Sequence, residues 1–327
     1  MATIIIATIL AIVSIIAFVA SVRQEKRRFL NIGLFFLACG LTVYCIEMIS
    51  GDGWIYTYFL SYLFLLFSIA CVVLFLVCLA AAKEMYDRKY PRNLVLVHLG
   101  LSILTLLFIP FFYYSAGGPI FISVGDALIH LPLMFTVYLA LSFGAFVIYS
   151  FQSRVVPTST KWDYILIVDN LAANGHMTAR LRLRLDLVRR LCMKARGRAR
   201  IILPNAETAV IARDYLCERG IEPENVTSLY ADDDSLRAKI AALPDAPCAV
   251  KPYHLGLIVT DDCLACRTMH ELRTIGLRGT VLGCPVSLGT WAVKLLEEYR
   301  SMLWLHSRAL CLVTVIWLIQ CAFTLNR

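Results

Sequence analysis

Charged residues are scarce in the first half of this 327-residue chain. Only 14 of the 54 Asp, Glu, Lys and Arg residues lie before residue 152, whereas 38 lie between residues 152 and 300. This scarcity excludes a wholly water-soluble protein, and the mean hydropathy of +0.72 agrees with that conclusion. We therefore expect a membrane domain at 1–151, a soluble domain at 152–300 and a C-terminal membrane helix at 301–327.

The sequence also lacks the short motifs of several common enzyme classes. It contains no GxSxG, no HExxH and no Walker A sequence. Of its 12 cysteines, half lie in apolar stretches and the others are irregularly spaced in the soluble part. This spacing is not that of a disulfide framework, and it is typical of a reducing compartment.

Long apolar runs replace charge in the first half of the chain. A helix needs about 20 apolar residues to cross the hydrocarbon core of a membrane. Runs of this kind cover residues 3–22, 29–49, 56–82, 93–114, 131–151 and 302–324. The sequence therefore predicts an α-helical membrane bundle of about six spans.

The loops between these runs alternate in charge. RQEKRR at 23–28 and KEMYDRKYPR at 83–92 each carry four basic residues, while the loops at 50–56 and 115–130 carry none. By the positive-inside rule, the basic loops and the soluble domain lie in the cytoplasm and both chain ends lie outside. We expect a multi-pass protein of the cell (inner) membrane.

Apolar runs alternate with helical patterns in the soluble part. Strands are expected at 164–168, 199–204, 225–230, 255–261 and 279–285, with helices at 179–195, 207–220, 234–243 and 264–276. The first half of 179–195 also alternates as a strand does, but Leu181, Leu185 and Val188 fit helical spacing. The pattern predicts an α/β doubly wound fold with a mainly parallel sheet, in which ligands bind at the carboxyl ends of the strands.

Four stretches of the soluble part resemble one known family. They are NGHMTARLRLRLD at 174–186, YLCERGIEPENV at 215–226, VTDDCLACR at 259–267 and GTVLGCPVSLGTWAVKLLEEYRSML at 279–303. Their order and spacing resemble the YdcF-like (SanA/ElyC-type) family of membrane-associated domains of unknown function, over about residues 161–300. The resemblance implies a bacterial, envelope-related role and a small anionic or nucleotide-like ligand.

The resemblance and the strand ends together indicate candidate ligand-binding residues. They are Asp169, Asn170, Asn174, Gly175, Arg184, Asn205, Glu207, Ser235, Thr260, Asp261 and Arg267. The chain departs from the family after the first strand, where Asp169 and Asn170 replace glycines, and at Leu264, which replaces a histidine. Glycine loops let backbone amides approach an anion, and histidine is the most adaptable proton carrier. The departures therefore favour a pseudoenzyme that binds without turnover, or a membrane scaffold or sensor that binds a protein partner.

Two other groups of residues admit more than one interpretation. The aspartates of the strand-end loops (Asp169, Asp232, Asp233, Asp234, Asp261 and Asp262) favour capping of helix N-termini over binding of Mg²⁺. Cys263, Cys266 and His270 favour a packing role over a redox or zinc site, so they are weak metal candidates. No cofactor follows from the sequence.

Basic residues are dense between Arg180 and Arg200. The favoured interpretation of this run is a solvated helix face, and contact with anionic lipid headgroups is the next. The run contains no aromatic residue on which bases could stack, so nucleic-acid binding is not expected.

Overall fold

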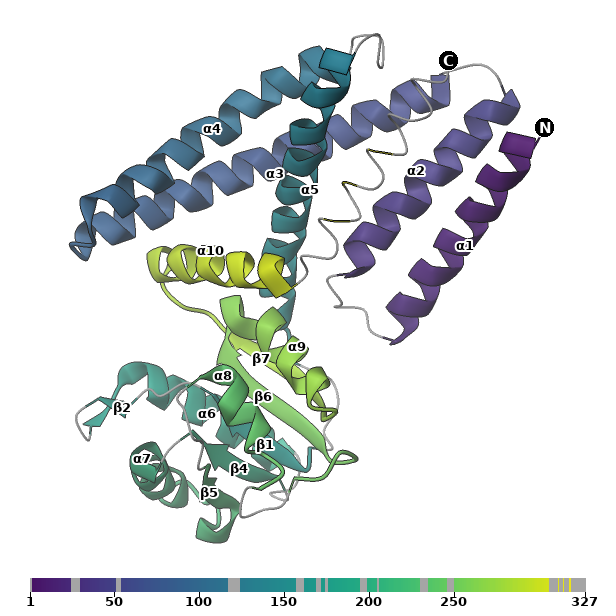
Figure 1. Cartoon of the computed structure of the whole chain (residues 1–327). Helices are drawn as coiled ribbons and strands as arrows, with labels where there is room; N and C mark the ends of the chain where they lie inside the picture. Colours follow the sequence, from purple (N-terminus) through teal and green to yellow (C-terminus); the bar gives the residue numbers. More distant parts are fainter. Residues whose placement is uncertain are drawn as a thin grey trace. The chain divides into compact units, whose positions relative to one another are not determined.

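Figure 1 shows the computed structural model of the protein. It describes residues 2–24, 30–50, 54–116, 124–156, 162–168, 172–173, 176–194, 199–204, 206–229, 235–245 and 250–305, with positions 311, 314 and 318. The chain forms two compact units. A helical unit comprises Met1–Ile148 and Leu288–Arg327, and an α/β unit comprises Tyr149–Ser287.

Apolar helices make up the described part of the helical unit. They are α1 (Ala2–Gln24), α2 (Leu30–Ser50), α3 (Trp54–Asp87), α4 (Arg92–Ala116), α5 (Val124–Ser153) and α10 (Leu288–Leu305), where the last residues of α5, from Tyr149, belong to the α/β unit. Helix α1 packs against α2, and α3 packs against α4 and α10 (Figure 1). Hydroxyl groups inside the helices bond to backbone carbonyls one turn earlier, as Ser68 does to Phe64 at 2.8 Å.

Two helices of the described residues are long and apolar enough to cross a membrane. They are Ser61–Asp87, within α3, and Phe135–Ser153, within α5. The prediction of about six spans is therefore wrong. Thr8–Arg23 and Arg92–Leu107 form shorter apolar helices, and most of the run at 302–324 lies outside the described residues. Within the described residues, the other apolar runs do not give a helix that meets both the length and the apolar composition that a span needs.

Polar contacts hold α10 in the helical unit. At its start, the Arg88 guanidinium donates a hydrogen bond of 2.7 Å to the Thr290 hydroxyl. Further along, the Tyr299 hydroxyl donates to the Leu139 carbonyl at 2.7 Å and lies 2.7 Å from the Ser142 hydroxyl. Tyr299 is buried, so these bonds satisfy a polar group that would otherwise lose its partners.

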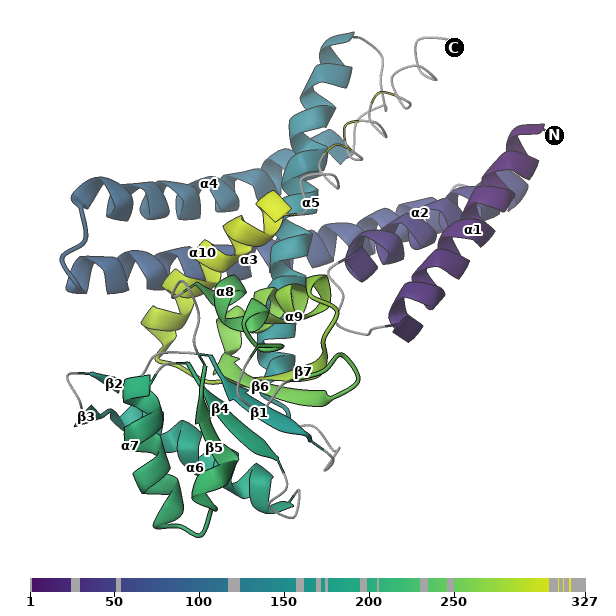
Figure 2. The same cartoon turned by 60° about the horizontal axis from the view of Figure 1, so that its bottom comes forward.

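A five-stranded parallel sheet forms the centre of the α/β unit (Figure 2). Its strands are β1 (Tyr164–Ile167), β4 (Arg200–Leu203), β5 (Val226–Ser228), β6 (Leu255–Asp261) and β7 (Arg278–Cys284). They lie in the order β5-β4-β1-β6-β7, and every pair is parallel. The predicted parallel sheet is thus present. Its order reverses between β1 and β6, which makes this the topological switch point of the fold.

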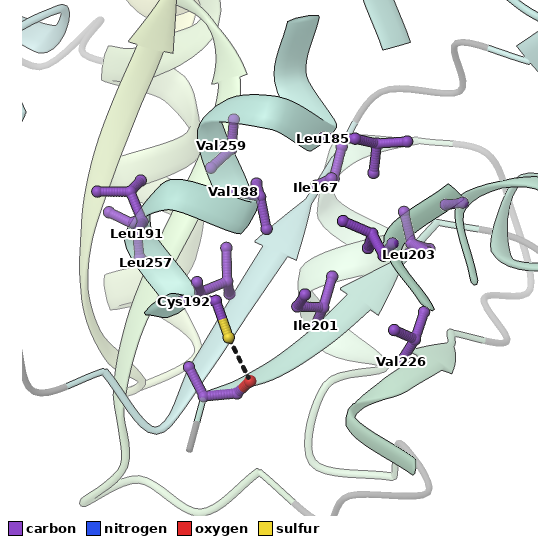
Figure 3. Packing of buried hydrophobic residues seen from close by; sticks show 14 of the residues in the cluster. Ile167, Leu185, Val188, Leu191, Cys192, Ile201, Leu203, Val226, Leu257 and Val259 are labelled. Atoms are coloured by element: carbon purple, nitrogen blue, oxygen red, sulfur yellow. Dashed lines mark hydrogen bonds between the residues drawn. The ribbon is translucent and has the colours of Figure 1, made fainter. Parts of the chain in front are cut away.

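Helices cover both faces of this sheet. Successive residues of each strand point to opposite sides, so the apolar strands present side chains to the helices on each face. The helices are α6 (Ala179–Lys194), α7 (Ala206–Cys217), α8 (Leu236–Ala241) and α9 (Ala265–Thr274). Ile165 and Ile167 of β1 pack in the cluster that contains the buried side chains of α6 and α7 (Figure 3). Tyr164 and Leu166 pack in the opposite cluster, with those of α8 and α9. The sheet is therefore buried on both faces, as its continuous apolar strands predict.

Local signals fix the ends of the helices. The Thr178 hydroxyl accepts a hydrogen bond of 3.2 Å from the amide of Leu181 and so caps α6. Gly220 and Gly276 follow α7 and α9 with φ of 87° and 81°, in the left-handed region that glycine adopts without steric strain. These two glycines end the helices as the sequence predicts.

One hairpin in the α/β unit was not predicted. Strands β2 (Ala172–Ala173) and β3 (His176–Met177) pair antiparallel between β1 and α6. Each has two residues, which is too short for a period-two pattern to stand out from its surroundings.

The register of β1 against β6 places the largest side chain of β1 beside a glycine. Tyr164 is the partner of Gly256, and Ile167 is the partner of Val259. A Cβ atom at Gly256 would lie 2.1 Å from the Tyr164 ring, so the ring occupies the space that a side chain would need. Gly256 is therefore required by close approach, not by backbone conformation.

Candidate functional site at the switch point

Two buried aspartates stand at the carboxyl end of β6, beside the switch point. Asp261 is the last residue of the strand and Asp262 begins the following 3₁₀ turn (Asp262–Leu264). Both residues are fully buried. Because an isolated carboxylate is strongly destabilised away from water, each needs a cationic partner.

Arginines from α6 neutralise Asp261. Arg184 forms an ion pair with the Asp261 carboxylate, and Arg180 pairs with the same oxygen at 2.5 Å. The two arginines stand one helical turn apart, so both reach the strand end from one face of α6. They differ in exposure, since the side chain of Arg184 is 2% exposed and that of Arg180 is 37% exposed. Arg180 is therefore the arginine of this pair that remains accessible to solvent.

Asp262 pairs with the chain that precedes the sheet. Arg154 donates to one Asp262 oxygen from Nε at 2.7 Å, and its terminal nitrogen lies 2.5 Å from that oxygen. The other oxygen accepts from the Cys263 amide at 2.8 Å. Burial raises the pKa of Asp262, and the Arg154 ion pair offsets only part of that rise.

The segment before Arg154 packs tightly against the end of the neighbouring strand β7. A Cβ atom at Gly283 would lie 2.1 Å from the Ser153 hydroxyl and 2.7 Å from Cα of Asp262. Glycine is thus needed where the end of α5 meets β6 and β7. This contact places Arg154 against Asp262.

The capping interpretation of the aspartates is wrong at Asp261. Its carboxylate makes no helix-capping hydrogen bond and binds arginines instead. Ser235 is the residue that caps, because its hydroxyl accepts from the Ala238 amide at 3.2 Å at the start of α8. Ser235, which the sequence indicates as a ligand-binding residue, therefore has a structural role as a helix cap.

The remaining predicted residues fall in several places. Thr260 is fully buried in β6, next to Asp261. Arg267 lies in α9, whose buried side chains pack on the opposite face of the sheet from α6. Glu207 lies in α7, but its side chain is outside the described residues. The predicted residues that lie entirely outside the described residues are Asp169, Asn170, Asn174, Gly175 and Asn205.

The predicted cysteine motif is placed at the start of α9. Cys263 is buried in the 3₁₀ turn, and Cys266 is half-buried in the first turn of the helix. His270 lies one turn further along α9. Within the described part of the chain, no three His, Cys, Asp or Glu side chains are grouped to hold a metal ion.

Sequence reasoning missed Arg180 and Arg154 as members of this site. A signal for Arg180 exists, because it precedes Arg184 by four residues and therefore shares its helix face. Arg154 has no comparable signal, since it meets Asp262 across 108 positions of sequence. Only the folded chain brings this pair together.

The α/β unit is thus a doubly wound domain with a buried cluster of arginine and aspartate side chains at its switch point. The domain belongs to a chain whose described residues include two helices able to cross a membrane. Comparison with protein-family models, curated proteins and solved structures found no match to the chain. The resemblance to the YdcF-like family therefore stays a prediction.

Proposed function

We propose that this protein is a divergent, bacterial YdcF-like membrane protein whose α/β unit binds a small anionic or nucleotide-like ligand without turning it over. The binding site of this proposal is the carboxyl edge of the sheet between β1 and β6. The observation that supports it most directly is the convergence of Arg180 and Arg184 on Asp261 at that edge. In open α/β sheets, ligands bind at the carboxyl ends of the strands where the strand order reverses.

The chemistry of the cluster suits an anion. Asp261 fixes both guanidinium groups in place, so that no side-chain freedom is lost when a ligand binds. Arg180 remains accessible to water and can donate charge-assisted hydrogen bonds to a phosphate or carboxylate. The buried Arg184 supports Arg180 indirectly, because it shares the carboxylate and holds that strand end against α6.

The location belongs to the same proposal. We place the protein in the inner membrane in more than one pass, with the α/β unit in the cytoplasm and an envelope-related role. The basic segment 23–28 supports this orientation, because it precedes α3 and, with spans in α3 and α5, lies on the same side of the membrane as the α/β unit. The irregular spacing of the cysteines in the α/β unit, among them Cys217 and Cys266, suits a reducing compartment. A reporter fused at residue 160 should be active on the cytoplasmic side, and activity on the outer side would refute the orientation.

A non-catalytic scaffold or sensor that binds a protein partner is the second candidate. The observation that favours it is the exposed apolar surface on the helices of one sheet face, where Leu183 of α6 is 71% exposed and Val210 of α7 is 63% exposed. Exposed large apolar residues beside cations also suit contact with anionic lipid headgroups.

Ligand titration of the full chain in detergent separates the first candidate from the second. Nucleotides should raise the unfolding temperature, with or without Mg²⁺, and Arg180→Gln should reduce the rise. Arg190→Gln is the matched control, because Arg190 is exposed on the same helix away from the described Asp261 cluster. A temperature shift that is absent, or is equally large in Arg180→Gln, would show that this edge is not the ligand site.

A further inference from the structure

A cavity opens at the opposite edge of the sheet, where the strands begin. Its volume is about 350 Å³, which falls in the range of sites that hold small organic molecules. Its lining residues are Asp163, Tyr164, Arg200, Val250, Lys251, Tyr253 and His254. They come from the amino ends of the neighbouring strands β4, β1 and β6 and from the turn before β6.

A proline-containing turn presents three of these side chains. Residues 251–254 read KPYH, and the His254 amide donates to the Lys251 carbonyl at 2.9 Å. Proline at the second position of such a turn fixes the backbone before any ligand arrives. The Lys251 amide also donates to Nδ1 of His254 at 3.2 Å. Because Nδ1 is an acceptor there, the neutral ring carries its proton on Nε2, which can donate to a ligand.

The turn holds an aromatic ring in a defined position. Tyr253 is 65% exposed, yet its ring meets the His254 ring edge-on at a centroid distance of 4.7 Å. The Lys251 ammonium lies 5.9 Å from the centroid of the same ring. An exposed aromatic face that is positioned by its neighbours is a surface on which a planar group can stack.

The charges of the cavity favour an anion. Arg200 and Lys251 are exposed cations, and Asp163 is the acidic lining residue. The Asp163 carboxylate accepts a hydrogen bond of 2.7 Å from the Leu255 amide, which ties it to the start of β6. Arg200 and Lys251 supply cationic donors and His254 supplies a ring N–H, and such donors bind phosphate and carboxylate groups.

We propose that this amino-edge cavity binds a small aromatic phosphate, with the phosphate between Arg200 and Lys251 and the ring against Tyr253. The site is independent of the carboxyl-edge cluster, because it lies at the other end of the same strands. A test at one edge can therefore fail without deciding the outcome at the other.

Phenyl phosphate is the probe that combines both groups, and inorganic phosphate and phenol each supply one. We expect ligand-observed NMR on the full chain in detergent to show saturable binding of phenyl phosphate, with a dissociation constant on the order of 1 mM for a ligand of this size. Each single-group probe should bind less tightly. Lys251→Gln and Arg200→Gln should each weaken binding by about fivefold or more, because each removes a charge-assisted contact.

Three further variants sharpen the result. Lys251→Arg should retain binding, which excludes misfolding as the cause of the loss in Lys251→Gln. Tyr253→Leu should remove the preference for phenyl phosphate over inorganic phosphate. Arg190→Gln, which alters an exposed cation of α6 outside both proposed sites, should bind as the unaltered chain does. The proposal is overturned if phenyl phosphate does not bind saturably, or if the Lys251→Gln and Arg200→Gln variants bind it as tightly as the unaltered chain.

Discussion

Burial should decide how much each arginine of the Asp261 cluster contributes to stability. Arg180 and Arg184 bond to the same carboxylate oxygen, so a count of contacts would rank them equally. Their exposures differ widely, however, at 37% and 2%. We predict that Arg184→Leu destabilises the α/β unit much more than Arg180→Leu does.

The magnitudes follow from what each substitution leaves behind. Arg184→Leu removes the buried cation that faces Asp261 and leaves the partly solvated Arg180, and breaking a buried pair in this way costs about 3–5 kcal/mol. Because Arg180 stays in place, the lower end of that range applies. Arg180→Leu removes a cation that water already screens, and such pairs contribute about 0–1 kcal/mol.

The measurement must report on the α/β unit alone. Cys192 of α6 suits this purpose, because its side chain is fully buried in the core (Figure 3). Burial also raises the pKa of its thiol. Its Sγ also donates a weak hydrogen bond to the Ala199 carbonyl at 3.6 Å. The rate at which a thiol reagent labels Cys192 under increasing denaturant, resolved by mass spectrometry, gives the free energy of unfolding for each variant.

A double variant completes the cycle. Arg184→Leu with Asp261→Leu removes the buried carboxylate along with its partner, and it should recover a large part of the stability that Arg184→Leu loses. If the two single arginine variants unfold at the same denaturant concentration, exposure does not set the contribution and the reasoning fails. If the double variant is less stable than Arg184→Leu, the penalty does not come from the loss of the buried cation beside Asp261.

Three other predictions concern packing and protonation. Gly283→Ala should destabilise the α/β unit by about 1–3 kcal/mol, as measured by denaturant unfolding. Adding Ser153→Ala to this variant should not restore the stability, because Cα of Asp262 also crowds the new methyl group. Tyr299→Phe should lower the free energy of unfolding of the helical unit by about 1 kcal/mol, since the hydrogen bond to the Leu139 carbonyl is lost, and a thermal melt in detergent measures it. Burial raises the pKa of Asp262 above its ordinary 3.8, so the native state holds its proton more tightly than the unfolded chain. Stability relative to Asp262→Asn should therefore fall as pH rises from 3.8 through the raised pKa, and a flat difference across that window would contradict the shift.

The α/β unit was predictable from sequence because its signals are local. Strand β6 occupies Leu255–Asp261, the range that its apolar run indicates. Helix α6 was the ambiguous element, and its buried row of Leu181, Leu185 and Val188 follows helical spacing. Its alternation was misleading, since Leu183 continues the strand-like pattern but is exposed.

The charged site was only partly predictable. Arg184 and Asp261 were identified, but as separate ligand residues and not as partners of each other. No local pattern states which of many arginines reaches a given strand end, because that depends on how α6 crosses the sheet. The amino-edge cavity was missed for a related reason, since Arg200 and Lys251 meet only when β4 and β6 flank β1. The count of about six spans was wrong, since the described residues form two helices that are both long and apolar enough to cross a membrane.

The contact between the Tyr164 ring and Gly256, at the amino end of β6, determines the alignment of the strand that carries the switch-point aspartates. In a parallel pair, a slip of two residues would preserve the inward and outward faces of both strands, so apolar patterning alone does not forbid it. Such a slip would move Asp261 by about 6.6 Å along the strand, out of reach of Arg180 and Arg184. It would also place the Tyr164 ring beside Ile258 or His254, where a side chain already fills the space. The Tyr164 ring fits only beside the residue of β6 that has no Cβ atom, so this contact selects one alignment of the two strands. That alignment determines where Asp261 meets Arg180 and Arg184.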